Sequence, residues 1–164
     1  MKDTKFLVFS FKFLKKKDER GFTLIELLVV IVIIGLLTTL GVVNYLSARQ
    51  RARDAQRKSN VQQIQSALEL YRSDQHAYPA SLPACNASLT DAGNTTTYMK
   101  NIPCDPSGAS YYNGGTYYYN LTGSSYTLAS CLENGSDTNT GVVSTSPGGS
   151  GSCSSGKWYV LTNP

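Results

Sequence analysis

One carboxylate, that of Glu26, lies inside the longest apolar stretch of the chain, residues 22–43. A helix of this length spans roughly 33 Å, close to the hydrocarbon thickness of a bilayer, about 30 Å. A charged group at membrane depth is costly, so its presence there indicates a functional partner. The chemistry open to Glu26 is charge pairing, since a nearby cation would neutralise it and a helix N-terminus favours a carboxylate.

Three interpretations fit this apolar stretch. A secretory signal peptide has a shorter apolar core with a small residue after it, whereas here the small residue, Gly21, comes before. A plain membrane anchor fits the length but leaves Glu26 without a role. The third interpretation, which we favour, is cleavage after Gly21, which keeps the helix and exposes a new amino group on Phe22. Glu26 would then pair with the Phe22 amine of a neighbouring subunit inside an apolar filament core.

The residues around this point carry a family resemblance. Residues 15–21, Lys-Lys-Lys-Asp-Glu-Arg-Gly, followed by Phe-Thr-Leu-Ile-Glu at 22–26, resemble the class III leader and N-terminus of type IV prepilins and type II secretion pseudopilins. The resemblance implies that prepilin peptidase cuts after Gly21, that Phe22 is N-methylated, and that Glu26 is the assembly glutamate. It also implies a type IV pilin-like α+β fold, in which a long N-terminal helix packs on a small antiparallel β-sheet.

Four cysteines lie beyond the apolar stretch: Cys85, Cys104, Cys131 and Cys153. They form no C-x-x-C pair, and the single histidine, His76, is not spaced as a zinc ligand, so we expect two disulfides in an oxidising, extracytoplasmic compartment. Four cysteines allow three connectivities. We prefer Cys85 with Cys104 and Cys131 with Cys153, because each pair closes one local loop and contributes on the order of 3 kcal/mol.

The polar residues do not form a catalytic set. One histidine leaves no Ser-His-Asp or Cys-His arrangement. Asp105, between two prolines, and Asp137, in a polar loop, show no paired-carboxylate pattern. We therefore expect that the protein is not an enzyme.

One long helix must position Glu26. No proline or glycine interrupts residues 44–71, and Pro79 ends the helical pattern. Four apolar residues recur at spacings of three and four: Val61, Ile64, Leu68 and Tyr71. We predict a helix over residues 22–73, with a membrane or filament-core half (22–43) and an amphipathic half (44–73). The leader (1–21) precedes it, and a disulfide-bonded loop and sheet domain (74–164) follows.

A basic cluster lies on the amphipathic half of the helix: Arg49, Arg51, Arg53, Arg57 and Lys58, against Asp54. We interpret it as a solvated face near lipid headgroups or a contact with neighbouring subunits. A nucleic-acid site would interleave aromatic residues, and none falls between residues 49 and 58. Residues 1–21 hold seven of the 15 basic and three of the 11 acidic side chains, so the net charge of +4 lies in the leader. We expect no specific nucleic-acid partner.

Short strands in the last third of the chain predict an antiparallel sheet packed on the apolar stripe. The predicted strands cover residues 111–112, 116–121, 125–131 and 157–161. The first two would join as a hairpin through Asn113-Gly114-Gly115. Residues 79–115 are otherwise predicted as loop, and residues 133–156, rich in Gly, Ser, Thr and Asn, as a long surface loop between Cys131 and Cys153.

A second resemblance covers this C-terminal half. Tyr78-Pro79, Ile102-Pro103, Asp105-Pro106 and Tyr126-Thr127-Leu128, leading to Glu133-Asn134, resemble the landmarks of the general secretion pathway protein G group, the major pseudopilin of type II secretion. That group carries calcium in a late acidic loop. The resemblance makes Glu133, Asn134 and Asp137 candidate ligands, whose oxygens with those of the backbone could meet calcium's demand. The loop is less acidic than in that group, and its flanking cysteines could staple it instead, as in type IV pilins. We expect no other cofactor.

These features indicate a structural filament subunit that forms a homopolymer and assembles with other pilins or pseudopilins. The resemblance implies prepilin peptidase/methylase, an assembly ATPase and an inner-membrane platform protein as partners. We prefer a type II secretion pseudopilin. The alternatives are a type IV major pilin for adhesion, motility or DNA uptake, a minor pilin that binds a ligand, and a simple membrane-anchored surface protein.

Leader lysines predict a cytoplasmic N-terminus and one pass through the inner membrane before export into an extracytoplasmic, cell-surface filament.

Overall fold

The computed structural model describes residues 21–108, 113–148 and 153–163. Residues 1–20 of the predicted leader and the predicted strand at Tyr111-Tyr112 lie outside these described residues. The chain divides into two compact units, residues 1–41 and 42–164, and the helix α1 (Leu24–Gln75) runs through both. The predicted single helix over residues 22–73 is therefore confirmed to within two residues at each end.

The end of α1 follows from local chemistry. His76 takes a left-handed conformation with φ of 56°, and its N–H donates to the carbonyl of Arg72 at 2.8 Å. This is the usual way in which a residue just past a helix satisfies one of the last carbonyls. Tyr78, which precedes Pro79, lies outside the helix, as the restriction on residues before proline requires.

The first unit exposes apolar side chains around α1. Between Phe22 and Leu37 the large apolar residues are 45–87% exposed, and Glu26 is the one charged residue among them. By length and composition this part of α1 could cross a membrane. An apolar surface on all sides of a helix is stable only where lipid or other helices cover it.

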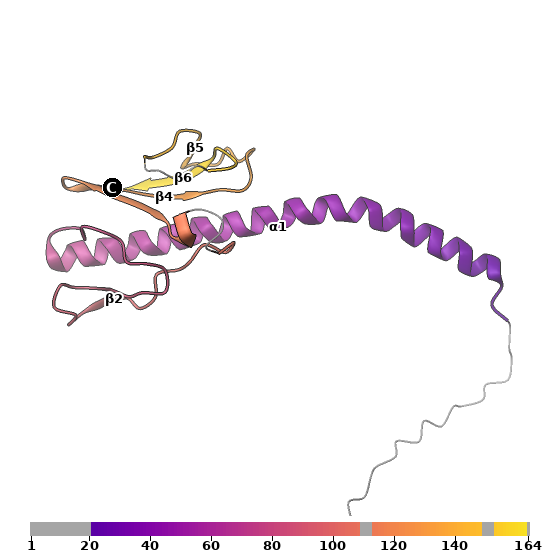
Figure 1. Ribbon diagram of the computed structural model, residues 1–164, viewed down its shortest axis with the longest axis horizontal. Helices are drawn as coiled ribbons and strands as arrows, with labels where there is room; N and C mark the ends of the chain where they lie inside the picture. The colour runs from indigo at the N-terminus through magenta and orange to yellow at the C-terminus, as the bar shows by residue number, and fades with distance from the viewer. Residues whose placement is uncertain (1–20, 109–112, 149–152, 164) are drawn as a thin grey trace, which may run out of the picture. The chain divides into compact units, whose positions relative to one another are not determined.

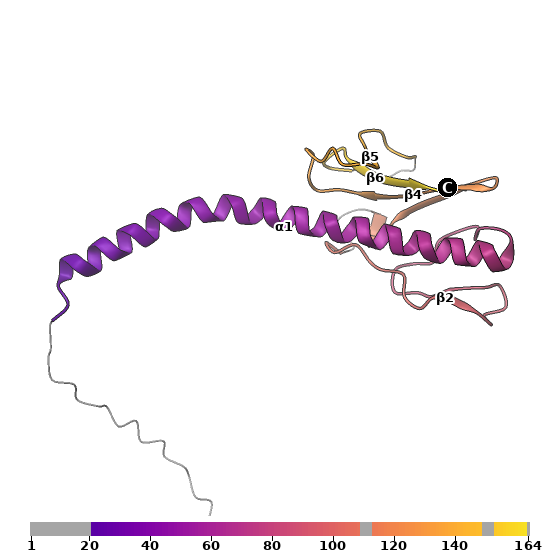
Figure 2. The same cartoon turned by 180° about the vertical axis from the view of Figure 1, so that it is seen from behind.

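In the second unit, four strands form an antiparallel sheet in the order β3-β4-β6-β5: β3 (Tyr118–Thr122), β4 (Ser125–Cys131), β5 (Val142–Val143) and β6 (Trp158–Thr162). Strands β3 and β4 join through a tight turn in which Gly123 has φ of 62°. Leu121 pairs with Tyr126 across this hairpin, and Leu128 pairs with Leu161 across β4 and β6. Within this unit, Figures 1 and 2 show the sheet along one side of α1 and β2 (Thr97–Met99) on the other.

The core of the second unit lies between α1 and the sheet. The predicted stripe packs there, with Val61, Ile64 and Leu68 fully buried and Tyr71 half-buried against them. The residues that meet the stripe come from the sheet and the loops: Tyr78, Leu89, Ile102, Tyr117, Tyr126, Leu128, Leu132 and Tyr159. A smaller cluster of Ala129, Cys131 and Trp158 uses the alternate positions of β4 and β6, so both faces of these strands are covered.

Three local predictions need correction. The segment predicted as loop holds a small hairpin, β1 (Leu89–Thr90) and β2, and the late loop contains β5. Residues Asn113–Gly115 form a 3-10 turn, and β3 begins at Tyr118 and pairs with β4, so no hairpin through residues 113–115 occurs among the described residues. Strands of two or three residues show no alternation by which a sequence could reveal them.

Candidate functional site

The N-terminal end of α1 is a reciprocal cap built by Thr23 and Glu26. The Thr23 amide and hydroxyl donate to Glu26 Oε2 at 2.9 and 2.7 Å, and the Glu26 amide donates to Thr23 Oγ1 at 3.3 Å. This arrangement is a capping box, in which a threonine and a glutamate three residues later satisfy free amides of the first turn. The carboxylate is thus held at the end of the helix, beside Gly21 and Phe22, which are both exposed.

Thr23 is a site residue that the sequence analysis missed. The signal was present, because Thr-Leu-Ile-Glu at residues 23–26 is the capping-box pattern placed directly before an apolar run. The predicted site residues Gly21, Phe22 and Glu26 therefore lie within one turn of helix and its approach, together with Thr23.

Two disulfides staple the second unit. Cys85 pairs with Cys104 and Cys131 with Cys153, with Cα atoms 4.9 and 5.5 Å apart and sequence separations of 19 and 22. These are the two pairs preferred from the sequence, and their Cα distances are ordinary for disulfides. The first closes the loop that holds β1, and the second joins the end of β4 to the segment before β6. Loops of this size give on the order of 3 kcal/mol each.

A buried arginine, Arg57, binds three carboxylates of the second unit. Its side chain is fully buried. Nε and Nη2 donate to the two oxygens of Asp105 at 2.7 and 2.8 Å, Nη1 donates to Asp54 at 2.8 Å, and Nη2 also donates to Glu133 and Ser107 at 2.8 Å each. Bidentate pairing of this kind uses the planar fork of arginine and gives the strongest side-chain hydrogen bonds.

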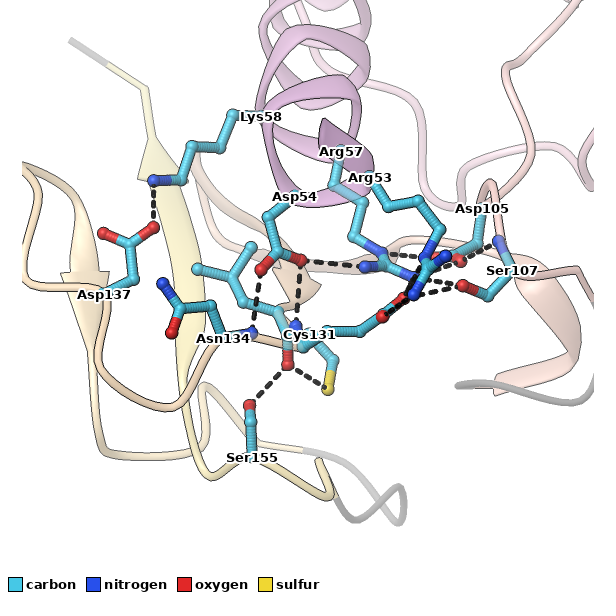
Figure 3. A network of polar contacts seen from close by, with 12 residues as sticks. Arg53, Asp54, Arg57, Lys58, Asp105, Ser107, Cys131, Asn134, Asp137 and Ser155 are labelled. Atoms are coloured by element: carbon cyan, nitrogen blue, oxygen red, sulfur yellow. Dashed lines mark hydrogen bonds and ion pairs between the residues drawn. The ribbon is translucent and has the colours of Figure 1, made fainter. Parts of the chain in front are cut away.

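Two further basic residues of α1 bind the loop after β4. Arg53 makes a second bidentate pair with Glu133. Lys58 Nζ donates to Asp137 Oδ2 at 2.6 Å, and the other oxygen of Asp137 accepts from the Asn139 amide at 2.9 Å. Figure 3 shows Lys58 pointing to one side of α1, toward Asp137, and the two arginines pointing to the other.

Asp54 completes this network from the helix itself. Its two oxygens accept from the backbone amides of Glu133 and Asn134 at 2.8 Å each, so the carboxylate fixes the turn that follows β4. Figure 3 shows it between Lys58 on one side and the arginines on the other. We call the whole set the helix–loop clasp: Arg53, Asp54, Arg57, Lys58, Asp105, Ser107, Glu133 and Asp137.

The clasp shifts the pKa values of three of its members, Glu133, Asp137 and Arg57. The hydrogen bonds from Arg53 outweigh burial and, with those from Ser107 and Arg57, lower the pKa of Glu133 to about 2. Burial alone would raise the pKa of Asp137, but its bonds from Lys58 and the Asn139 amide lower it instead. Burial alone would lower the pKa of Arg57, but its carboxylate partners raise it above the ordinary value. Glu133, Asp137 and Arg57 are thus all charged at neutral pH.

The basic cluster was only partly understood from the sequence. Arg49 and Arg51 are exposed, as a solvated face requires, whereas Arg57 is buried, and Arg53 and Lys58 bind carboxylates of the same chain. Asp54 and Arg57, at i and i+3, lie on one helix face toward the domain, but this spacing alone does not distinguish Arg57 from the exposed Arg51.

The known proteins that this chain resembles agree with these features. Residues 16–42 match the prokaryotic N-terminal methylation motif, and residues 44–146, more than half of the chain, match type II secretion system (T2SS), protein G. The chain belongs to the type II secretion system protein G family. It is therefore a pseudopilin, a membrane-anchored structural subunit of the secretion pathway and not an enzyme, as the sequence predicted. A pseudopilin is processed by prepilin peptidase and assembles with other pseudopilins.

Relatives in the protein G family come from several bacteria. The chain is 35% identical to the type II secretion system core protein G of Escherichia coli (strain K12) over 105 residues, 57% of this chain and 70% of that one. It is 32% identical over 106 residues to the core protein G of Pseudomonas aeruginosa, covering 60% and 75% of the two chains, and 31% identical over 104 residues to that of Vibrio cholerae, covering 59% and 71%. No solved structure matches the chain significantly.

The protein G resemblance implies a calcium ion in the late loop, and the donor atoms there do not fit one. Glu133 and Asp137, two of the three candidate ligands, are each paired with basic side chains of α1. The third, Asn134, accepts from the Ser136 amide through Oδ1 at 3.1 Å. Within the described residues, no three Asp, Glu, His or Cys side chains gather as a group that could hold a metal ion.

Proposed function

We propose that this protein G family member is the main building block of its pseudopilus and polymerises through the first half of α1. Prepilin peptidase cuts after Gly21, Phe22 is N-methylated, and Glu26 pairs with the Phe22 amine of a neighbouring subunit. The leader covers residues 1–21, the filament-core helix 22–43, its amphipathic continuation 44–73, and the outward-facing domain 74–164. Before assembly the subunit spans the inner membrane once with a cytoplasmic N-terminus, and an assembly ATPase with a platform protein extracts it into an extracytoplasmic filament.

The observation that supports this proposal is the contrast between Glu26 and its surroundings. Apolar side chains from Phe22 to Leu37 are exposed around the helix, and one carboxylate lies at its N-terminal end. A bundle of identical helices would cover that apolar surface. It would also bring a carboxylate of one subunit to the amine of the next, which neutralises both charges in an apolar setting.

The test is intact mass and N-terminal sequencing of protein from a sheared filament fraction. We expect a chain that begins at methylated Phe22, four hydrogens lighter than its reduced form because of the two disulfides. A chain that begins at Met1 and occurs only in membranes would overturn the proposal. It would leave a simple membrane-anchored domain.

A second test separates secretion from other filament functions. Deletion of the gene should retain the secreted proteins of the host inside the cell envelope, and the wild-type gene should restore their release. The Gly21→Asp variant, which blocks the proposed cut, should not restore it. Normal secretion in the deletion strain, with loss of surface motility or adhesion instead, would favour a type IV pilus.

A further inference from the structure

The first part of the late loop, residues 133–139, is held against α1 by four charged side chains of the helix. Asp54 holds the backbone amides of Glu133 and Asn134, and Arg53, Arg57 and Lys58 bind the loop's two carboxylates. The contacts join residues 76 to 80 positions apart in the sequence. They therefore join the helix to a distant part of the chain, as a covalent cross-link would.

The oxygens of this region are already committed to donors within the chain. Asp54 accepts from Arg57 and from two backbone amides, Glu133 accepts from Arg53, Arg57 and Ser107, and Asp137 accepts from Lys58 and the Asn139 amide. Calcium needs six to eight oxygens at 2.3–2.6 Å. To gather them here it would have to displace charge-assisted hydrogen bonds, which are the strong ones.

The charge of the region is also balanced. A groove of about 580 Å³ lies beside the loop, and its lining includes two basic residues, Arg51 and Lys58, and two carboxylates, Asp54 and Asp137. Together, the groove and the clasp hold four basic side chains (Arg51, Arg53, Arg57 and Lys58) and four carboxylates (Asp54, Asp105, Glu133 and Asp137). A divalent cation would enter without a net negative charge to attract it, and the Lys58 ammonium would repel it.

We propose that the helix–loop clasp replaces a metal ion in this pseudopilin, so that the fold of its domain is independent of calcium. Lys58 is the central residue, because its ammonium holds Asp137, the carboxylate that would otherwise be the free ligand of the loop. The Cys131–Cys153 disulfide closes the same loop covalently. This inference concerns the stability of the folded subunit, so it stands or falls separately from the proposed route of assembly.

The experiment is thermal unfolding of the full chain in detergent micelles, followed by the fluorescence of Trp158. This residue is the single tryptophan and is 2% exposed. The wild-type protein is measured in excess EDTA, in millimolar CaCl2 and in millimolar MgCl2. We expect the same Tm in all three. A Tm that falls in EDTA and recovers with CaCl2 but not with MgCl2 would overturn the proposal.

Variants of Lys58 test whether its ammonium group holds the loop against α1. Lys58→Gln should lower the Tm by roughly 5 °C or more, because it leaves the Asp137 carboxylate without its cation. Lys58→Arg should keep most of the wild-type Tm, because it keeps the charge. Arg51→Gln is the matched control: it removes an exposed basic residue of the same groove and should leave the Tm unchanged. A wild-type Tm in Lys58→Gln would show that the Lys58–Asp137 pair does not stabilise the domain and would overturn the role of Lys58.

Discussion

The two halves of α1 use charge in opposite ways. In the first half, a single carboxylate stands among exposed apolar side chains and finds its hydrogen-bond donors within one turn, at Thr23. In the second half, the charged residues Asp54 and Arg57 are buried and find partners far along the chain. In one continuous helix, the charge of the first half is satisfied locally and the buried charges of the second half are satisfied by distant residues.

The difference shows where each half obtains its stability. The second half is complete within one chain, since its apolar stripe is covered by the sheet and its buried charges are paired. The first half is not, since its large apolar side chains remain exposed among the described residues. Lipid before assembly and other subunits after it are the covers that a pseudopilin meets, so this half acquires its stability from outside the chain.

The largest expected effect is that of Glu26→Ala on assembly. Removal of one partner of a charge pair in an apolar core leaves the other unpaired, at about 3–5 kcal/mol for each subunit contact. We expect filaments to be lost from the sheared fraction while the Tm of the detergent-solubilised chain stays at the wild-type value. Wild-type amounts of filament, or a lowered Tm, would show that the two halves are not separable in this way.

Arg57→Met should have the largest effect on the folded domain. It leaves Asp54, Asp105 and Glu133 facing one another without their common cation, and we expect a loss of about 3–5 kcal/mol in the free energy of unfolding. Urea unfolding monitored by Trp158 fluorescence measures it. The control is Arg51→Met, at an exposed position, which should change that free energy by less than about 0.5 kcal/mol. Equal midpoints for the two variants would contradict the buried network.

Removal of the second disulfide should have a somewhat smaller effect. The Cys131→Ala/Cys153→Ala double variant should lose about 3 kcal/mol in the free energy of unfolding, because the unfolded chain is no longer constrained. Urea unfolding of the oxidised proteins gives the number. Membrane insertion of the variant should be normal, because the cysteines lie in the second unit. A failure to insert would contradict the independence of the two halves.

The smallest effect is the acid dependence of the clasp. The folded-state pKa of Glu133 is about 2, below its ordinary value of 4.5. A lowered pKa means that the ionised form is favoured in the folded state, so its contribution is complete above about pH 4.5 and is lost as the pH falls toward 2. Urea midpoints between pH 7 and pH 2 should fall more steeply for the wild type than for Glu133→Gln. Parallel curves would show that Glu133 is not stabilised by its arginines.

Much of the architecture could be predicted from local pattern. Residues 22–43 are apolar enough to indicate a membrane or filament helix, and the spacing of Val61, Ile64 and Leu68 identifies the face that the sheet covers. Strands β3, β4 and β6 were recognisable because five to seven residues are enough to show alternation and flanking turns. The preferred cysteine pairing rested on short loops, which depend on sequence separation alone.

The sequence by itself determined the elements whose signals are local: the helix, the longer strands and the short loops that favour the two disulfides. The capping-box pattern at Thr23 and Glu26 is equally local, although the sequence analysis missed it. Only the tertiary structure decided where the short strands β1, β2 and β5 form and which residues of the basic cluster are buried and paired. Arg49 and Arg57 look alike in sequence, yet one is exposed and the other is buried. The reason is that Arg57 owes its burial to Asp105 and Glu133, 48 and 76 residues away, and pairing over such distances leaves no periodic trace in the chain.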